Sequence, residues 1–150
     1  PFPERRQFSL SDAIWETADP YGGIAAARGR TYTQQVEDGL SMTGDRSAIQ
    51  QTLSILLDNA VKYSPEGGSI SLHAYRSGRR TIIEVSNTAP ENCGDISRFF
   101  DRFYRADPSR SDVTRGTGIG LSIAKAAIDA HGGSISVKKN GEDITFTVRL

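Results

Sequence analysis

Residues 45–68 read DRSAIQQTLSILLDNAVKYSPEGG, the pattern of a long amphipathic helix with a marked start and end. Asp45 can cap the helix, and Pro65 followed by two glycines can end it. Apolar side chains recur every three or four residues and form one stripe along the helix: Leu53, Leu56, Leu57, Ala60 and Val61. The pattern predicts a helix from about residue 46 to 63 with one buried face.

Shorter patterns on both sides of this helix predict the remaining elements. Before it we expect a linker remnant at 1–7, a helix capped by Ser9 or Ser11 that breaks near Pro20, and strands at 31–37 and 40–43 across an Asp38-Gly39 turn. After it we expect a hairpin of strands at 70–75 and 81–85, an irregular segment at 87–115 with a short helix near 96–100, a helix within 116–131, and a hairpin at 134–138 and 144–150. The second long helix has its own apolar stripe, formed by Gly120, Ile123, Ala124, Ala127 and Ile128.

These elements predict the fold class. Because tight turns join most of the strands, the sheet should be mainly antiparallel, and each long helix has one apolar face to lay on it. We therefore expect an α+β fold: a two-layer α/β sandwich with a mixed, mostly antiparallel sheet of about five strands packed on about three helices.

The composition fits a single soluble domain and argues against several other classes of protein. The chain has 150 residues, 18 basic and 18 acidic side chains and no formal net charge, which disfavours a general nucleic-acid-binding protein. No apolar run approaches the ~18 residues that span a bilayer, and residues 1–7 lack the apolar run of a signal peptide, so we expect no membrane contact in this segment. The single cysteine, Cys93, excludes a disulfide within one chain and favours a reducing compartment.

The first candidate site is the polar face at the end of the 46–63 helix. Asn59, Lys62 and Tyr63 are three or four residues apart, so they share one face, roughly opposite the apolar stripe. An Asn carbonyl oxygen can ligate Mg²⁺, a Lys ammonium can bind phosphate, and a Tyr ring can stack on a ligand. A solvated helix face has the same periodicity, so periodicity alone leaves both interpretations open.

The second candidate site is the run GTGIGL at 116–121, just before the second long helix. Glycines let the backbone approach a ligand closely, and free amides at a helix N-terminus attract phosphate. The run follows a polar loop rather than a strand and lacks the Lys-Ser/Thr pair of a P-loop, which disfavours both a dinucleotide fingerprint and a P-loop. A flexible glycine hinge remains the alternative.

The third candidate site is the run FDRFYR at 100–105. Phe100 and Phe103 are spaced to anchor a loop on the body of the protein, and Arg105 can hold a phosphate through two hydrogen bonds. The polar segment 106–115 is typical of a lid that becomes ordered on binding. An ordinary helix end with surface arginines would give the same pattern.

The order and spacing of these runs are more specific than each run alone. DNAVKYSPEGG at 58–68, FDRFYR at 100–105, GTGIGL at 116–121 and HGG at 131–133 together resemble the ATP-binding catalytic domain of bacterial sensor histidine kinases. That domain has the Bergerat-type fold shared with gyrase B, Hsp90 and MutL. The resemblance extends from about Phe8 to Leu150, so we assign residues 8–150 to such a domain.

The resemblance implies a role for each matching residue. Asn59 would ligate Mg²⁺, Lys62 would lie near the phosphates, and Arg105 would lie near the terminal phosphate, which makes these three the expected catalytic residues. The implied ATP-binding set is larger: Asn59, Lys62, Tyr63, Asn87, Tyr104, Arg105, Gly116, Thr117, Gly118, Ile119, Gly120 and Leu121. The implied activity is binding of ATP with Mg²⁺ and donation of the γ-phosphate to a histidine on a separate dimerisation and phosphoacceptor domain. The implied partners are those acceptor helices and a response regulator, in the cytoplasmic part of a membrane-anchored sensor kinase.

Two positions depart from the family pattern. Ile55 stands where the family has a second Asn, or a catalytic Glu in gyrase-like members, which disfavours a water-activating ATPase. Asn87 begins the stretch that corresponds to Asp-x-Gly-x-Gly in the family, and it keeps a carbonyl acceptor for the adenine amino group. A degenerate nucleotide-sensing module and an anti-sigma-type serine kinase of the same fold are the alternatives.

Neither histidine has the sequence context of a phosphoacceptor. His73 lies within a predicted strand, and His131 ends a predicted helix, where it would pack or act as a C-terminal cation. We therefore expect the acceptor histidine to lie outside these residues and the isolated chain to be monomeric.

Overall fold

The computed structural model describes residues 5–101 and 120–150. Its helices are α1 (Leu10–Ala18), α2 (Tyr21–Ala27), α3 (Arg46–Tyr63) and α4 (Gly120–Ala130), with a short 3-10 turn η1 (Ile96–Arg98). Its strands are β1 (Arg6–Ser9), β2 (Thr31–Val36), β3 (Ser41–Gly44), β4 (Ser69–Ser77), β5 (Arg80–Thr88), β6 (Ser134–Asn140) and β7 (Asp143–Arg149).

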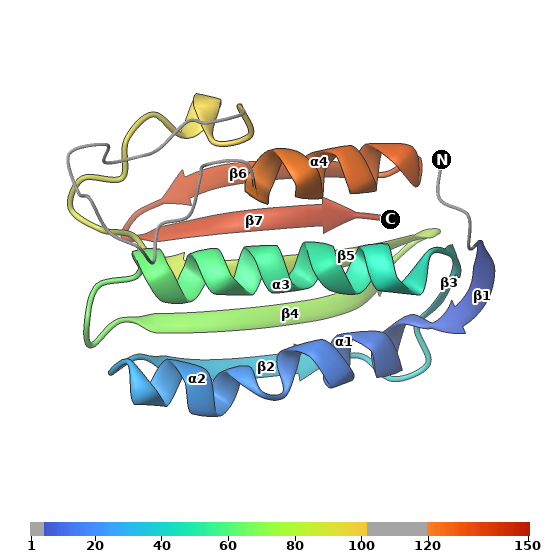
Figure 1. Cartoon of the computed structure of the whole chain (residues 1–150), viewed down its shortest axis with the longest axis horizontal. Coiled ribbons are helices and arrows are strands. Elements are labelled where there is room, and N and C mark those ends of the chain that lie inside the picture. Colours follow the sequence, from blue (N-terminus) through green and yellow to red (C-terminus); the bar gives the residue numbers. More distant parts are fainter. Residues whose placement is uncertain (1–4, 102–119) are drawn as a thin grey trace.

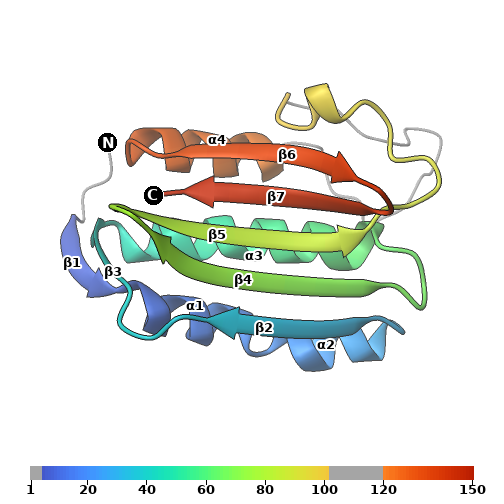
Figure 2. The same cartoon turned by 180° about the vertical axis from the view of Figure 1, so that it is seen from behind.

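The larger sheet has five strands in the order β2-β4-β5-β7-β6, and β1 pairs with β3 in a separate small sheet. β2 runs parallel to β4, and every other pair of neighbours is antiparallel. Helices α1 to α4 lie on one face of the larger sheet, in front of the strands in Figure 1 and behind them in Figure 2. The predicted two-layer α+β sandwich with a mixed, mostly antiparallel sheet is confirmed.

The hydrophobic core lies between α3 and the larger sheet. The predicted stripe of α3 is buried as a whole, because each of its five side chains is at most 4% exposed. Opposite it, Leu72, Ile83 and Val85 of β4 and β5 are at most 1% exposed and belong to the same cluster. This packing fixes which side of α3 faces the sheet and therefore which side faces away from it.

Three of the five residues predicted for the α4 stripe are buried, Gly120 is only partly buried, and Ile123 is exposed. Ala124 and Ile128 are fully buried and Ala127 is 7% exposed, but Ile123 is 42% exposed. At ~100° per residue, Ile123 lies at the margin of the face that the other three residues define. The prediction for Ile123 is therefore wrong.

The start of α3 is fixed by its cap and by the end of α4. Asp45 Oδ1 accepts a hydrogen bond from Ala48 N at 3.1 Å, which confirms Asp45 as the cap. His131 Nε2 accepts a hydrogen bond from Asp45 N at 3.0 Å, while His131 Nδ1 lies 2.7 Å from the carbonyl oxygen of Ala127. The imidazole therefore joins the last turn of α4 to the first turn of α3.

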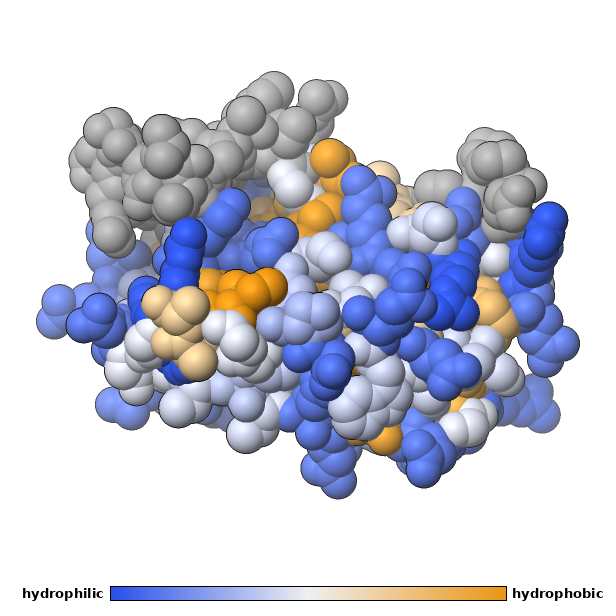
Figure 3. Space-filling model, turned by 60° about the horizontal axis from the view of Figure 1, so that its bottom comes forward, coloured by the Kyte–Doolittle hydropathy of each residue, from blue (hydrophilic) through white to orange (hydrophobic). Residues whose placement is uncertain are grey.

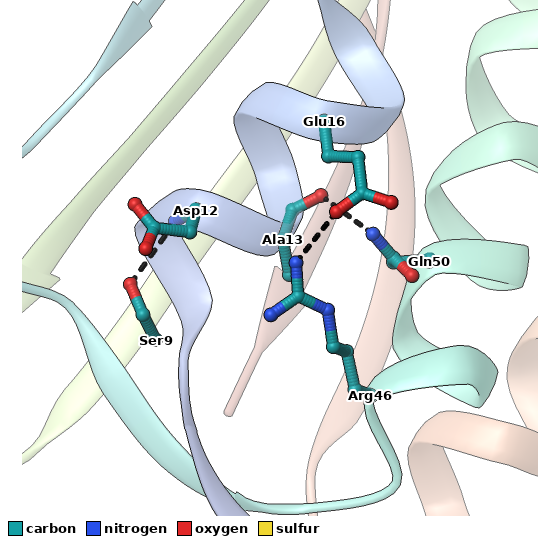
Figure 4. Close-up of polar contacts among 6 residues, drawn as sticks. All are labelled: Ser9, Asp12, Ala13, Glu16, Arg46 and Gln50. Atoms are coloured by element: carbon teal, nitrogen blue, oxygen red, sulfur yellow. Dashed lines mark hydrogen bonds and ion pairs between the residues drawn. The ribbon is translucent and has the colours of Figure 1, made fainter.

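Polar side chains also join the first turn of α3 to α1, as Figure 4 shows. Arg46 Nη2 lies 2.7 Å from Glu16 Oε2, and Gln50 Nε2 donates a hydrogen bond to the carbonyl oxygen of Ala13 at 3.2 Å. Both contacts are made by residues in the first five positions of α3. They hold the end of the helix that lies away from Asn59 and Lys62.

The first predicted helix is broken near Pro20 into α1 and α2, as the sequence indicates. Ser9 is the cap of α1, since its Oγ accepts a hydrogen bond from Asp12 N at 3.1 Å (Figure 4).

Figure 3 views the molecule from the α1–α2 side, where hydrophobic residues form small groups separated by hydrophilic ones. Trp15 and Ile24 of this pair are 40% and 43% exposed. Within residues 5–101 and 120–150, every helix is too short or too polar to cross a bilayer.

The turn at Asp38-Gly39 does not join paired strands, which corrects the prediction. β2 pairs with β4 and β3 pairs with β1. Ser11 explains the difference, because its Oγ donates to the carbonyl oxygen of Glu37 at 2.7 Å and accepts from Leu40 N at 2.9 Å. These bonds tie the turn to the start of α1 and direct the chain away from the larger sheet.

The folded part of the chain begins earlier than the predicted linker boundary. Arg6 and Gln7 belong to β1, where they pair with Gly44 and Thr43 of β3. The pairing partner lies more than thirty residues along the chain, so no local pattern marks residues 6 and 7 as a strand.

Candidate functional site

The polar end of α3 lies on the side of the helix that faces away from the core. Asn59 and Tyr63 are partly exposed and Lys62 is exposed, whereas the intervening Ala60 and Val61 are buried. Within the described residues, the side chains of Asn59 and Lys62 make no hydrogen bond or ion pair with the protein. As predicted, Asn59, Lys62 and Tyr63 therefore lie together on the solvent-exposed side of α3. The side chains of Asn59 and Lys62 are available to a ligand.

The end of β5 lies beside this end of α3. β4 begins at Ser69, soon after α3 ends, and Asn87 of β5 pairs with Ile70 of β4 and with Ile144 of β7. Asn87 is therefore a strand residue, which corrects the predicted start of the irregular segment. It is 5% exposed on the face that also buries Val85, and its Nδ2 donates to the carbonyl oxygen of Thr88 at 2.8 Å. The amide is thus held under the helix layer with its Oδ1 free of any recorded partner in the described residues.

The start of α4 packs against α3 one turn before Asn59. A methyl group placed on Gly120 would lie 3.5 Å from Cγ2 of Ile55, and Ile55 and Leu121 both pack on the core cluster. The described end of the glycine-rich run is therefore adjacent to α3 one turn before Asn59. The other predicted residues of the two later runs lie outside the described residues: Tyr104, Arg105, Gly116, Thr117, Gly118 and Ile119.

The segment before these undescribed residues is anchored to the sheet by aromatic packing. Phe100 meets Phe146 of β7 edge-on with ring centroids 5.9 Å apart, and Phe99 stacks on the same ring at 6.3 Å. The predicted anchoring role of Phe100 is confirmed, whereas Phe103 lies outside the described residues. Asp95 caps η1, and its hydrogen bonds from the hydroxyl and amide of Ser97 lower the pKa of its carboxyl group.

The family of the chain follows from a comparison made on the whole sequence. Residues 44–150 match the model of a family described as histidine kinase-, DNA gyrase B- and HSP90-like ATPase. The chain belongs to this family. The matched region includes all of α3, where the polar end lies, and all of α4.

Curated relatives in this histidine kinase-like ATPase family are sensor proteins. The chain is 36% identical over 148 residues to the probable sensor protein PcoS of Escherichia coli. It is 34% identical over 152 residues to the sensor histidine kinase CusS of Escherichia coli strain K12. These alignments cover 98% and 99% of the chain but 31% of each relative, so the chain spans less than a third of their length.

Solved structures of histidine kinases share the fold. The nucleotide-free catalytic domain of ThkA matches with a TM-score of 0.81 and 24% identity, covering 98% of this chain and 95% of that domain. Full-length ShkA in complex with AMPPNP matches with a TM-score of 0.79 and 24% identity, covering 97% of this chain and 30% of ShkA. A complex of ThkA with the response regulator protein TrrA matches with a TM-score of 0.77 and 22% identity, covering 97% of this chain and 41% of that one. These likenesses establish the fold.

Ile55, the first departure from the family pattern, has a packing role in this chain. Its side chain is partly buried, packs on the core cluster and faces Gly120 at the start of α4. An apolar residue here closes the seam between the two helices. Ile55 is therefore explained by packing and does not itself indicate a lost site.

Two contacts at the polar end of α3 have no signal in the sequence. Tyr21 Oη donates to Asp58 Oδ1 at 2.5 Å, and Arg30 Nη2 donates to the carbonyl oxygen of Ser64 at 2.5 Å. The partners are 37 and 34 residues apart in the chain. No motif spacing connects them, so only the fold reveals the contacts.

Both histidines contact other residues of the protein. His131 packs at the end of α4 and forms the hydrogen bonds described above. His73 lies in β4, with Nδ1 3.9 Å from Glu84 Oε1 and its ring 4.5 Å from that of Tyr75. Neither lies at the polar end of α3.

Proposed function

We propose that this domain binds ATP with Mg²⁺ and donates the γ-phosphate to a histidine on a separate phosphoacceptor domain. The observation that carries the proposal is the polar end of α3, where Asn59 and Lys62 are free of protein partners within the described residues, beside the start of α4. Membership of the histidine kinase-like ATPase family supports ATP as the ligand. The AMPPNP bound to the structural neighbour ShkA supports it further.

The residues at this end suit a magnesium ion carried by a nucleotide. Within residues 5–101 and 120–150, no group of three His, Cys, Asp or Glu side chains is placed to hold a metal by itself. The amide oxygen of Asn59 is a hard ligand of the kind Mg²⁺ accepts, and Mg²⁺ usually keeps several waters and takes phosphate oxygens as further ligands. We assign Asn59 as the protein ligand.

The chemistry assigned to the remaining residues is charge neutralisation and positioning. Phosphoryl transfer needs the donor held in line with the acceptor and its developing charge offset. When bound, Mg²⁺ would neutralise phosphate charge. Lys62 and Arg105 would offset the charge on the transferred group, and Tyr63 and Asn87 would orient the base. The nucleophile would come from the acceptor helices.

The relatives support a proposal for the partners and the location. PcoS and CusS are sensor proteins, and ThkA forms a complex with a response regulator. We infer that a response regulator receives the phosphate from the acceptor histidine, and that this domain acts in the cytoplasm as part of a membrane-anchored sensor. The isolated chain would be monomeric.

Calorimetric titration with a non-hydrolysable ATP analogue and Mg²⁺ tests the proposal. Asn59→Ala should weaken Mg²⁺-dependent binding at least about tenfold, because loss of a metal ligand should cost no less than loss of a group that only orients one. Asn87→Ala should weaken binding with or without the metal. Gln51→Ala, which removes an exposed amide from the same helix, is the matched control and should bind like the wild type.

Two results would overturn parts of this proposal. If the wild type bound no nucleotide, the domain would be a degenerate module. If Asn59→Ala bound the analogue and Mg²⁺ as tightly as the wild type, Asn59 would not be the metal ligand. Phosphate transfer is tested separately, by adding the acceptor helices of the full-length protein in trans with ATP and Mg²⁺.

A further inference from the structure

The segment Asn59–Tyr63 lies between two residues that are held by side chains from the N-terminal part of the chain. On its N-terminal side, Tyr21 Oη donates to Asp58 Oδ1 at 2.5 Å and lies 3.5 Å from the carbonyl oxygen of Ser54. Tyr21 is 7% exposed and belongs to the core cluster, so its ring is fixed by packing while its hydroxyl bonds to α3. Burial and the Asp58 carboxylate raise the pKa of Tyr21, so the hydroxyl stays a donor throughout the neutral range.

On the C-terminal side, Arg30 holds the last turn of α3. Its Nε donates to the carbonyl oxygen of Ser64 at 3.1 Å and lies 3.3 Å from Ser64 Oγ, and its Nη2 donates to the same carbonyl at 2.5 Å. Nη1 donates to the carbonyl oxygen of Arg28. Ser64 is 1% exposed and caps α3 through its amide, which donates to Ala60 at 3.1 Å. A guanidinium at a helix C-terminus also matches the sign of the helix dipole there.

Backbone contacts bring the same two parts of the chain together. Gly67 N donates to the carbonyl oxygen of Gly29 at 2.8 Å, and Thr31 N donates to that of Gly68 at 3.1 Å. The loop that follows α3 is therefore attached to the residues on both sides of Arg30. The last turn of α3 cannot fray without breaking these contacts.

We propose that Tyr21 and Arg30 are positioning residues, which hold the last turn of α3 so that Asn59 and Lys62 are presented to the nucleotide in fixed places. The inference rests on the proposed function. Both residues precede residue 44, where the family match begins. They act through Asp58 and Ser64, which flank the site, rather than through the ligand.

The other end of α3 offers a matched control. Arg46 joins α3 to α1 through Glu16 at 2.7 Å, so it too is an arginine that ties α3 to an N-terminal element. It lies roughly 20 Å along the helix from Asn59, since a helix rises about 1.5 Å per residue. A general loss of stability should therefore follow from either arginine, whereas a loss of positioning should follow from Arg30 alone.

The test compares four variants, Tyr21→Phe, Arg30→Met, Arg30→Lys and Arg46→Met, at a temperature where circular dichroism shows each to be folded. Affinity for a non-hydrolysable ATP analogue with Mg²⁺ is measured by calorimetry, and exchange of the amides of residues 60–64 by mass spectrometry. Arg30→Met should weaken binding about tenfold and speed exchange in the last turn, as expected when the group that orients a ligand-bearing residue is lost. Tyr21→Phe, which keeps the buried ring, should change both readouts in the same direction by less. Arg30→Lys should recover part of the loss, and Arg46→Met should match the wild type in both.

Three outcomes would contradict the inference or its premise. Wild-type affinity in both Tyr21→Phe and Arg30→Met would overturn the positioning role and leave the proposed function standing. An equal loss of affinity in Arg46→Met would reduce the effect to stability and would also overturn it. If the wild type itself bound no nucleotide, the proposed function would fail first, and the assignment of positioning residues would fail with it.

Discussion

The two ends of α3 use polar side chains in opposite ways. At the N-terminal end, the Asp45 side chain caps the helix at Ala48 N, and Arg46 and Gln50 bond to α1, at distances of 2.7 to 3.2 Å. At the C-terminal end, Asn59 and Lys62 make no such contact within the described residues. The contacts there are made by the flanking residues instead. Polar groups that are already bonded stabilise the fold, whereas polar groups that the fold places and leaves unbonded are available for binding.

This difference also separates what a mutation should do at each end. A mutation that removes one partner of a hydrogen bond at the N-terminal end leaves the other donor or acceptor without a partner and lowers stability. A mutation of Asn59 or Lys62 on the solvent-exposed face of the C-terminal end removes a group that makes no hydrogen bond or ion pair within the described residues, so it should change stability little.

The largest effect should come from the buried stripe that both ends share. Leu57→Ala should lower the free energy of unfolding by about 3 kcal/mol, because Leu57 is fully buried and its loss leaves a cavity in the core. Urea denaturation followed by circular dichroism measures the change. Asn59→Ala is the comparison, and it should stay within about 0.5 kcal/mol of the wild type. If both variants lost equal stability, Asn59 would contribute to the stability of the fold. The proposed difference between the two ends of α3 would then be wrong.

The parts of the fold that sequence predicts are those set by neighbouring residues. The α3 stripe, the Asp45 cap and the β4–β5 and β6–β7 hairpins were all readable, because periodicity, capping and tight turns act within a few residues. The grouping of Asn59, Lys62 and Tyr63 belongs to the same class, since it follows from helical spacing alone.

The parts that sequence does not predict depend on distant partners. β1 and β3 pair across more than thirty residues, and Tyr21 and Arg30 meet α3 at separations of 37 and 34 residues. The turn at residues 38–39 signals a hairpin locally, but Ser11 redirects it from another element. Pairing of this kind is decided by packing, which no window of sequence contains. The predicted residues Arg105 and Gly116, outside the described residues, stay predictions.

A medium loss of stability should follow from crowding at the N-terminal end of α3. A methyl group on Gly44 would lie 2.6 Å from Cδ2 and 2.8 Å from Nε2 of His131, so Gly44→Ala should displace the ring that accepts from Asp45 N. We expect a loss of about 2 kcal/mol in the free energy of unfolding. Gly22→Ala in α2 is the control, because nothing lies within 4 Å and a helical alanine should be neutral or slightly stabilising. A Gly44→Ala variant as stable as the wild type would mean that the imidazole of His131 can move without cost. The contact between His131 and the N-terminal end of α3 would then contribute little to stability.

A smaller effect should come from the cap. Asp45→Ala removes the acceptor of the Ala48 amide and should lower the free energy of unfolding by about 1 kcal/mol. Asp45→Asn keeps an oxygen in the same place and should recover most of that loss. Denaturation of the two variants side by side separates the capping oxygen from the charge, because only Asn keeps the size and the oxygen of the Asp side chain. Equal losses in both would assign the effect to the charge of Asp45 rather than to capping.

The smallest effect should come from the exposed ion pair. The side chains of Arg46 and Glu16 are 39% and 67% exposed, so solvent and salt screen their attraction. Arg46→Met should lower the free energy of unfolding by about 0.5 kcal/mol at low salt, and the loss should shrink at 1 M NaCl, where the Debye length is about 3 Å. A double-mutant cycle with Glu16→Gln isolates the pair from the packing of the arginine stem. A coupling energy above about 2 kcal/mol would be as large as that of a buried ion pair. It would also show that the polar contacts at the N-terminal end of α3 contribute more to stability than the exposure of Arg46 and Glu16 indicates.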